Sequence, residues 1–270
     1  MNKKLFLFTL LLSINTCFAQ TDKILLNDVK DFFKMGGKIV LAPLNFESVD
    51  WIKFGSITAA TSLAYFSEEE VRDYLSEHHN KFKDNIFSVD KDYFVLALSA
   101  GIAGVYGYGL FGKNTEIRKL GFQLGEATIY STAVAAIFKF LAGRSRPYLD
   151  NGNNQFNPLT ANYDQNSFYS GHSTFYFALS TVLAEQIDNF FWDAGWYSLA
   201  ALVAVSRIYN DQHWFSDVIL GAAMGHFIGE FVVNNSNNSK EVSYQKTDYF
   251  LGVNFINYTP VYTINFKYNF

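Results

Sequence analysis

Cysteine and excess positive charge are both nearly absent from this 270-residue chain. The single cysteine, Cys17, falls in the N-terminal segment, so the remainder has no disulfide and no thiolate metal site. Lys and Arg number 21 against 25 Asp and Glu, and the net charge of −4 lacks the basic footprint of a nucleic-acid-binding protein. Aromatic residues make up 18% and charged residues only 17%, a composition that excludes intrinsic disorder.

The first twenty residues, MNKKLFLFTLLLSINTCFAQ, have the pattern of a secretory signal peptide. Lys3 and Lys4 precede an apolar stretch, and Cys17-Phe18-Ala19 forms a small-x-small cleavage site. We therefore predict a signal peptide over residues 1–19, cleaved after Ala19, and export across a bacterial inner membrane. The alternative is an uncleaved N-terminal anchor.

Long uncharged runs are also scarce. Tyr93–Gly112 is free of charge for 20 residues and could cross a bilayer. The other runs are shorter, such as the 14 residues of Phe54–Ser67, and runs of that length are more typical of buried core helices. We therefore expect the Phe54 run not to cross a membrane, and the protein to be membrane-associated or at most partly inserted.

Apolar periodicity predicts an all-α fold, a bundle of about six core helices over residues 20–240. The predicted helices lie near residues 50–65, 68–80, 92–110, 115–142, 171–188, 193–208 and 214–234. Residues 149–167 are rich in Asn, Gly and Pro, which predicts a loop long enough to be a functional lid.

Residues 241–270 change character, because apolar and polar residues alternate from Tyr262 to Phe270. This period of two predicts a C-terminal β-hairpin. An isolated hairpin is marginal in water, so we expect it to pack on the bundle or on a second subunit. The alternative is the closing strand of an outer-membrane barrel, which two strands alone cannot form.

Three clusters of polar residues follow one another along the helical region. The first places Lys139, Arg144 and Arg146 at the end of an apolar helix that Gly143 and Pro147 terminate. A guanidinium fork and a compact ammonium together suit phosphate oxygens. Taken alone, the same cations could simply complement a helix C-terminus.

The second cluster is Ser170, Gly171 and His172, which lead directly into an apolar helix. Ser170 can cap that helix, and Gly171 lets a ligand approach the backbone. Because free amides at a helix start favour an anion, His172 would lie beside an anion site. A capped helix with an incidental histidine is the simpler alternative.

The third cluster contains Arg207, His213 and Asp217. His213 and Asp217 are four residues apart and share a helix face, so the carboxylate could hold one imidazole N–H. The other ring nitrogen would then be available as a nucleophile. A His–Asp pair on the surface is the alternative.

In order, the clusters read K-x6-R-P, S-G-H and S-R-x5-H-x3-D. This signature resembles the type 2 phosphatidic acid phosphatase and vanadium haloperoxidase superfamily, which includes membrane-associated and class A acid phosphatase-like members. The resemblance covers residues 90–234 and carries three ordered motifs. One departure is Tyr169, which stands where the family pattern has proline; we expect its loss to alter loop order without removing a phosphate contact.

The resemblance implies a role for each matching position. His213 would attack phosphorus to form a phosphohistidine, Asp217 would fix its tautomer, and His172 would protonate the leaving oxygen and then activate water. The groups expected to hold the phosphoryl oxygens are Lys139, Arg146, Ser170, Gly171 and Arg207. No metal or other cofactor is implied, and Arg144 is expected to be an optional extra cation.

The expected activity is hydrolysis of a lipid phosphate or diphosphate, such as phosphatidic acid, an isoprenyl diphosphate or lipid A, at the periplasmic face of a membrane. Alternatives are a soluble periplasmic phosphatase for small phosphomonoesters, a vanadium haloperoxidase, and an envelope scaffold without activity. We expect no nucleic-acid partner. Of the remaining histidines, His78 and His79 are expected to be solvated and His226 to lie in the core.

Overall fold

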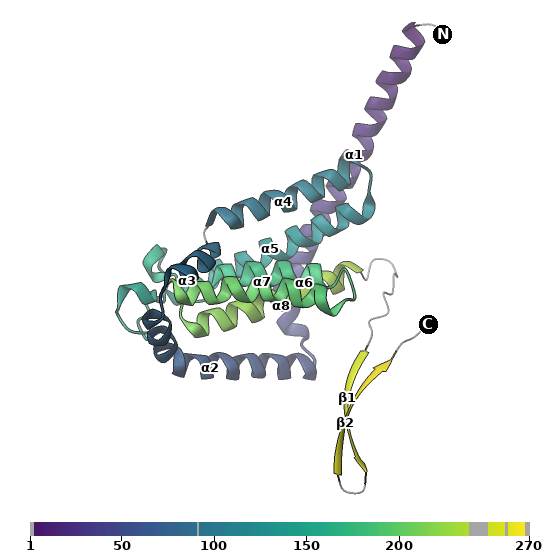
Figure 1. Ribbon diagram of the computed structural model, residues 1–270. Coiled ribbons are helices and arrows are strands. Elements are labelled where there is room, and N and C mark those ends of the chain that lie inside the picture. The colour runs from purple at the N-terminus through teal and green to yellow at the C-terminus, as the bar shows by residue number, and fades with distance from the viewer. Residues whose placement is uncertain (1–2, 91, 238–247, 257–258, 268–270) are drawn as a thin grey trace.

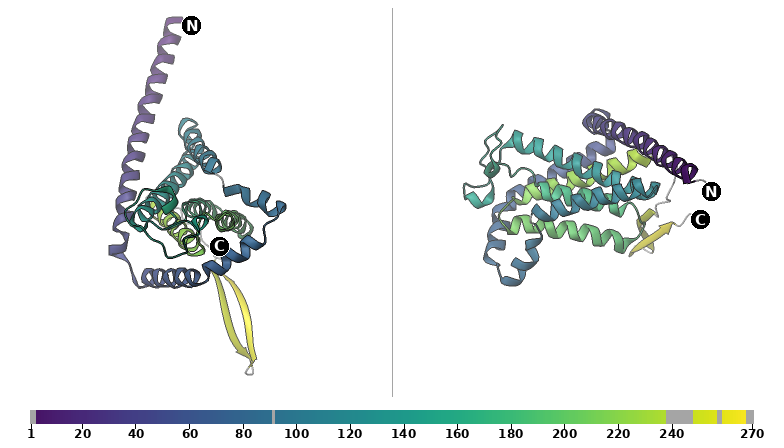
Figure 2. Two further views of the ribbon diagram at one scale, coloured as in Figure 1. Left: turned by 90° about the vertical axis from the view of Figure 1, so that its left-hand side faces the viewer. Right: turned by 90° about the horizontal axis from the view of Figure 1, so that it is seen from above.

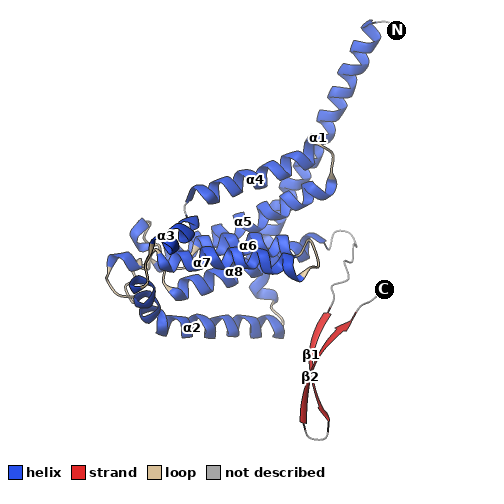
Figure 3. Ribbon diagram, viewed as in Figure 1, coloured by secondary structure: helices blue, strands red, loops and turns tan. Residues whose placement is uncertain are grey.

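The computed structural model describes residues 3–90, 92–237, 248–256 and 259–267 (Figure 1). Its α-helices are α1 (Lys3–Leu41), α2 (Ser48–Glu77), α3 (Lys81–Ile86), α4 (Asp92–Phe111), α5 (Thr115–Ala142), α6 (Gly171–Ala184), α7 (Phe190–Tyr209) and α8 (Phe215–Asn237), with 3-10 turns at Ala42–Asn45, Phe87–Asp90, Pro147–Leu149 and Tyr163–Gln165. The predicted all-α bundle is confirmed (Figure 3).

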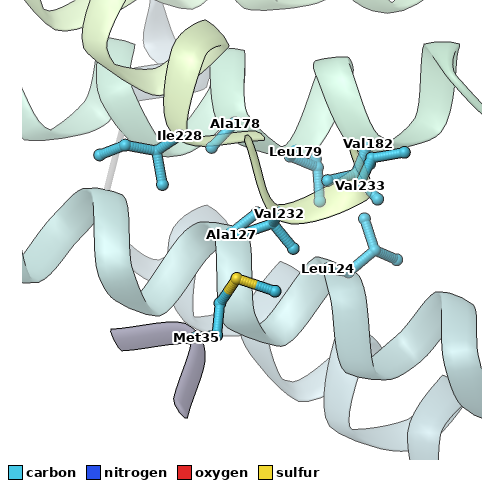
Figure 4. Packing of buried hydrophobic residues seen from close by; sticks show 9 residues of the cluster. All are labelled: Met35, Leu124, Ala127, Ala178, Leu179, Val182, Ile228, Val232 and Val233. Atoms are coloured by element: carbon cyan, nitrogen blue, oxygen red, sulfur yellow. The ribbon is translucent and has the colours of Figure 1, made fainter. Parts of the chain in front are cut away.

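Helix α6 is the central element of the bundle, because α5, α7 and α8 all pack against it. The core between α5, α6 and α8 is built from small and branched side chains, and Met35 of α1 reaches into it (Figure 4). Its buried members are Met35, Leu124, Ala127, Ala178, Leu179, Val182, Ile228, Val232 and Val233. Removing such side chains from water is the main favourable contribution to helix packing in an aqueous setting.

A glycine brings α8 unusually close to α6. A Cβ atom at Gly225 would lie 2.3 Å from the carbonyl oxygen of Thr174, a distance that no side chain can occupy. Close backbone approach of this kind fixes the relative positions of the two helices. Because both helices begin at the polar clusters, it also fixes the groups at their N-terminal ends.

The ends of the helices follow ordinary capping rules. The side chain of Asn114 accepts a hydrogen bond from the Ile117 amide at the start of α5, and Gly143 ends that helix with φ of 59°. A Cβ atom at Gly143 would collide with the carbonyl oxygen of Asn157, so glycine is required there for steric reasons as well. The chain thus leaves α5 sharply, directly before Arg144 and Arg146.

Helix α2 is one continuous helix, whereas the sequence predicted two, near residues 50–65 and 68–80. Ser67, which would suit a helix N-cap ahead of three glutamates, instead lies mid-helix, where its hydroxyl donates to the carbonyl oxygens of Leu63 and Ala64. The helix continues through Ser67 because tertiary packing buries the next residue, Glu68. Helix propensities are routinely overridden in this way.

Helix α2 also runs along much of the length of α8. Near its start, Lys53 pairs with Glu230 at 3.4 Å, and near its end Glu68 accepts a hydrogen bond from Ser216 at 2.7 Å. We call the end of the bundle that contains Ser216 the cluster end, and the opposite end the far end. Helix α1 crosses the far end at a steep angle to the other helices (Figures 1 and 2).

Three helices of the described residues are long and apolar enough to cross a membrane, at Tyr93–Phe111, Thr115–Ala142 and Phe215–Ser236. Helix α2, which contains the Phe54 run, is not among them. Large apolar side chains are nevertheless exposed on α2, α4, α5 and α7, including Phe66, Leu96, Phe140 and Phe191. Exposed apolar side chains in this number are typical of a protein with a membrane or protein contact.

At the C-terminus, β1 (Asp248–Ile256) and β2 (Thr259–Lys267) pair in antiparallel fashion, with Asp248 opposite Lys267. The other residues of the expected hairpin tail, 241–247, 257–258 and 268–270, lie outside the described part of the chain. Its packing on the bundle or on a second subunit stays a prediction.

Candidate active site

The three polar clusters meet at the cluster end. The C-terminal end of α5, the N-terminal end of α6 and the turn between α7 and α8 supply one cluster each. The Ser170 amide donates to the carbonyl oxygen of Asp217 at 3.0 Å, which joins the second cluster to the third. Lys139 Nζ donates to the carbonyl oxygen of Asn166 at 2.5 Å, which joins the first cluster to the segment before α6.

His213 is buried and is held by a backbone carbonyl. Its Nδ1 lies 2.8 Å from the carbonyl oxygen of Ser167. Because a carbonyl oxygen can only accept, Nδ1 must carry the proton, and Nε2 then keeps its lone pair. This is the tautomer that a nucleophilic histidine needs.

Asp217 was expected to hold the imidazole N–H itself, and this expectation is wrong in its geometry. The nearest carboxylate oxygen, Oδ2, is 3.9 Å from His213 Nδ1, beyond hydrogen-bond range. That oxygen instead accepts hydrogen bonds from Ser167 Oγ at 2.5 Å and from the Trp214 amide at 3.1 Å. Asp217 therefore acts on His213 by its charge and by holding Ser167.

Ser167 is a functional candidate that the sequence did not reveal. Its carbonyl oxygen binds His213 and its hydroxyl binds Asp217, so one residue sets the position of both. It lies three residues before the Ser-Gly-His motif, in a segment that the sequence identified only as loop. No local pattern distinguishes it from the other polar residues there.

Arg144 was expected to be an optional extra cation, but the structure gives it a different task. Its Nη1 donates to Asp217 Oδ1 and to Ser216 Oγ, both at 2.9 Å, while Nη2 pairs with Glu68 of α2. Arg144, Glu68 and Asp217 are each no more than 1% exposed. The Arg144 guanidinium therefore neutralises two buried carboxylates, Glu68 and Asp217.

Glu68 is not among the site residues that the sequence predicts. In the structure it lies behind the site and closes the buried ion-pair network, with Ser216 donating to its second oxygen. An opposing charge close by offsets part of the desolvation cost of each carboxylate, although burial still raises the pKa of Glu68.

Arg146 is oriented by four hydrogen bonds, none to a carboxylate. It donates to Gln212 Oε1 at 2.9 Å, to Asn166 Oδ1 at 2.8 Å and to the carbonyl oxygens of Tyr163 and Gln212. Its guanidinium also stacks 4.2 Å from the centre of the Tyr163 ring. Because these partners are neutral, its positive charge remains available to an anion.

Residues 149–167 form the loop that the sequence predicted, and much of it is fastened to the site. The amides of Ser145, Arg146 and Ser167 take part in backbone hydrogen bonds that bring both ends of the loop together. Arg144 and Phe156 form an isolated antiparallel bridge within it. The loop therefore supports the basic residues from the outside.

The second cluster begins α6 as expected. The Ser170 side chain accepts a hydrogen bond from the Ser173 amide at 3.3 Å and caps the helix. Tyr169, the departure from the family pattern, is fully buried, and its ring centre lies 5.6 Å from that of Phe138. An aromatic contact thus supports the entry to the helix where proline would have stiffened it.

Both site histidines are held neutral. Burial, together with the positive charges of Arg207, Lys139 and Arg146, lowers the pKa of His172 to about 3. Burial and Lys139 likewise place the pKa of His213 well below its usual range, despite the opposing effect of Asp217. A dianion bound among these cations would offset their charge and return the histidines toward protonation.

The other histidines lie away from this site. His78 and His79 are exposed on the polar end of α2 and after it, and His226 is partly buried in α8 beside Tyr197. Among the described residues, no group of three or more His, Cys, Asp or Glu is arranged to hold a metal ion. The geometry that the described residues do show is that of an anion site with two neutral imidazoles.

Basic residues and two histidines thus lie together at one end of a helical bundle. Residues 120–241 match the model of the PAP2 superfamily, which confirms the resemblance that the three motifs predicted. The match includes every motif residue from Lys139 to Asp217 and identifies this part of the chain as a PAP2 region.

Curated relatives and a solved structure are similar to this chain. Lipid A 1-phosphatase of Porphyromonas gingivalis is 28% identical over 178 residues, which is 64% of this chain and 36% of the relative. Lipid A 4'-phosphatase of the same organism is 40% identical over 65 residues, 24% of this chain and 28% of the relative. The chain thus spans about a third of the length of these curated relatives.

The crystal structure of Aquifex aeolicus LpxE aligns with a TM-score of 0.47 and 22% identity, covering 62% of this chain and 94% of that one.

The buried network yields a stability prediction. Arg144→Met leaves Glu68 and Asp217 buried without a cation, which should lower the free energy of unfolding by about 3–5 kcal/mol. Lys53→Met breaks the partly exposed pair with Glu230 and should cost below about 1 kcal/mol. Denaturant unfolding in detergent measures both variants. Equal losses would contradict the structural role of Arg144.

A second prediction concerns pH. The folded-state pKa of His172 lies below the unfolded value of about 6.5. As pH falls below about 6.5, His172 therefore becomes protonated in the unfolded chain while it stays neutral in the folded protein. Stability should therefore fall as pH drops from about 6.5 toward 4, by up to about 1.4 kcal/mol per unit for each such histidine. His172→Gln should make this slope shallower, and His78→Gln should not. An unchanged slope in His172→Gln would show that the imidazole is not held neutral.

Proposed function

We propose that this protein is a lipid phosphate or diphosphate phosphatase that works through a phosphohistidine without a metal ion. The observation that carries the proposal is the fixed tautomer of His213, whose Nδ1 faces the Ser167 carbonyl and whose Nε2 lone pair is left for a phosphorus atom. The surrounding cations supply the charge that holds a phosphoryl group.

In the first step, Lys139, Arg146 and Arg207 bind the phosphoryl oxygens, together with Ser170 and the Gly171 amide. His213 Nε2 attacks phosphorus, and the bond from phosphorus to the ester oxygen breaks. Preorganised donors directed at developing charge are commonly the largest contribution to catalysis. Asp217, held by Arg144 and Ser167, stabilises the positive charge that forms on the His213 ring.

His172 supplies the proton that the leaving oxygen needs. In the ligand-free site it is neutral, so it becomes an acid only once a phosphate dianion offsets the charge of Arg207, Lys139 and Arg146. After the alcohol leaves, the neutral imidazole accepts a proton from water, which attacks the phosphohistidine and releases phosphate. General acid and base assistance of this kind contributes about 10²- to 10⁴-fold.

A lipid substrate is supported by the surface around the bundle. The exposed apolar side chains of α2, α4, α5 and α7 suit contact with acyl chains, and the PAP2 relatives from Porphyromonas gingivalis are named as lipid A phosphatases. A small water-soluble phosphomonoester would gain nothing from that surface. Phosphates and diphosphates of membrane lipids are therefore the substrate class that we propose.

We also propose that the cluster end faces the periplasm, the compartment to which the leader at residues 1–19 directs the chain. Because α2 runs along much of α8, the Asn45 turn before α2 lies at the far end. In a fully inserted bundle the two ends would face opposite compartments. In a bundle that rests on the membrane after removal of the leader, both ends would be periplasmic.

The nucleophile can be tested by trapping the intermediate. Rapid quenching with radiolabelled phosphatidic acid should yield an acid-labile, base-stable phosphoprotein, because a phosphoramidate hydrolyses in acid. His213→Ala should form none, and His78→Ala should match the wild type. A small aryl phosphate should label far less at equal concentration. A serine adduct, or full turnover in His213→Ala, would refute the mechanism, and equal labelling by the aryl phosphate would refute the lipid preference.

The orientation can be tested by cysteine labelling in a Cys17→Ser background. Asn151→Cys, an exposed position in the loop, should react with an impermeant maleimide in cells whose outer membrane has been opened. Asn45→Cys serves as the far-end position. Labelling of Asn45→Cys would indicate a surface-bound bundle with a cleaved leader. Protection of Asn45→Cys from the maleimide would indicate an inserted bundle. Protection of Asn151→Cys until lysis would overturn the periplasmic site.

A further inference from the structure

A second charged cavity lies at the far end of the bundle, between α1, the first half of α5 and the end of α8. It measures about 170 Å³ and is lined by acidic and basic side chains together, among them Asp31, Lys34, Lys38, Lys119 and Glu126. Glu126 and Lys139 are separated by about 20 Å of α5, at 1.5 Å rise per residue. The cavity is therefore distinct from the phosphatase site. We call it the far-end pocket.

Glu126 is a buried carboxylic acid in the lining of this pocket. The residue is 1% exposed, it lines the cavity, and neither of its carboxylate oxygens has a hydrogen-bond partner among the described residues. A buried carboxylate without a donor carries a large desolvation cost. Ionisable residues placed this way inside an apolar helix are rare unless they bind something.

The neighbouring charges do not supply that donor. Arg118 and Tyr106 both donate to Asp28 instead, with Arg118 Nη1 2.5 Å from each carboxylate oxygen and the Tyr106 hydroxyl at 2.7 Å. The ammonium of Lys38 donates to Asn235 Oδ1 at 3.1 Å. The pocket therefore keeps an unused acceptor at Glu126 beside cations that an anion could reach.

We propose that the far-end pocket binds a zwitterionic group in which a primary ammonium is joined to a phosphate. The ammonium would donate its hydrogens to Glu126, and the phosphate would lie among the lysines at positions 34, 38 and 119. The pocket adjoins the first turns of α5 and the last turn of α8, both apolar enough to span a membrane, which is the depth at which lipid headgroups lie. An aminophospholipid is thus the ligand that fits both the charges and the location.

The test uses the full-length protein in nanodiscs of phosphatidylcholine, with phosphatidylethanolamine or phosphatidylglycerol added as competing probes. Native mass spectrometry counts the retained lipid, and thermal unfolding reports its effect on stability. Phosphatidylethanolamine should be retained about tenfold over phosphatidylcholine, whose methylated nitrogen cannot donate, because a hydrogen bond to a charged group is worth about a factor of ten or more. Soluble O-phosphoethanolamine should compete, which separates headgroup recognition from acyl-chain contact.

Two isosteric variants complete the test. Glu126→Gln removes the charge and should abolish the preference, whereas Glu116→Gln, at an exposed position of the same helix, should retain it. Thermal unfolding in phosphatidylcholine alone shows that both variants are folded. Equal retention of all three lipids by the wild type, or an unchanged preference in Glu126→Gln, would overturn the proposal and leave Glu126 as a buried neutral acid. Neither readout depends on phosphatase activity.

Discussion

The ion pairs of Arg144 with Glu68 and Asp217 are the interaction on which the site depends. One guanidinium joins α2, the segment after α5 and the start of α8, and all three charges are removed from water. Two buried carboxylates without a cation would repel each other and pay the full desolvation cost, so neither could remain ionised. Arg144 therefore makes it possible to have a charged Asp217 beneath the candidate nucleophile at all.

The same charge balance accounts for the state of the histidines. Burial and the positive charges of Arg207, Lys139 and Arg146 all lower the pKa of His172, so its imidazole is neutral. An anion bound beside these cations would offset their charge, so anion binding and protonation of the histidines would be coupled by Coulomb interactions.

The two ends of the bundle differ in how their buried carboxylates are compensated. At the cluster end, cations and carboxylates compensate one another through direct ion pairs. At the far end, Arg118 compensates Asp28 in the same manner, but Glu126 is left with unpartnered oxygens. Between the two ends, helices α6 and α8 approach each other closely at Gly225.

The sequence by itself determined the helical class and the order of the three motifs, because spacing along a helix and motif chemistry are local properties. Only the tertiary structure decided how the motif residues are supported. Glu68 and Arg144 are separated by 76 residues, and Ser167 and Asp217 by 50, so no local pattern pairs them. The continuity of α2 was decided in the same way, because burying Glu68 against Arg144 outweighs a serine cap worth only about 1 kcal/mol.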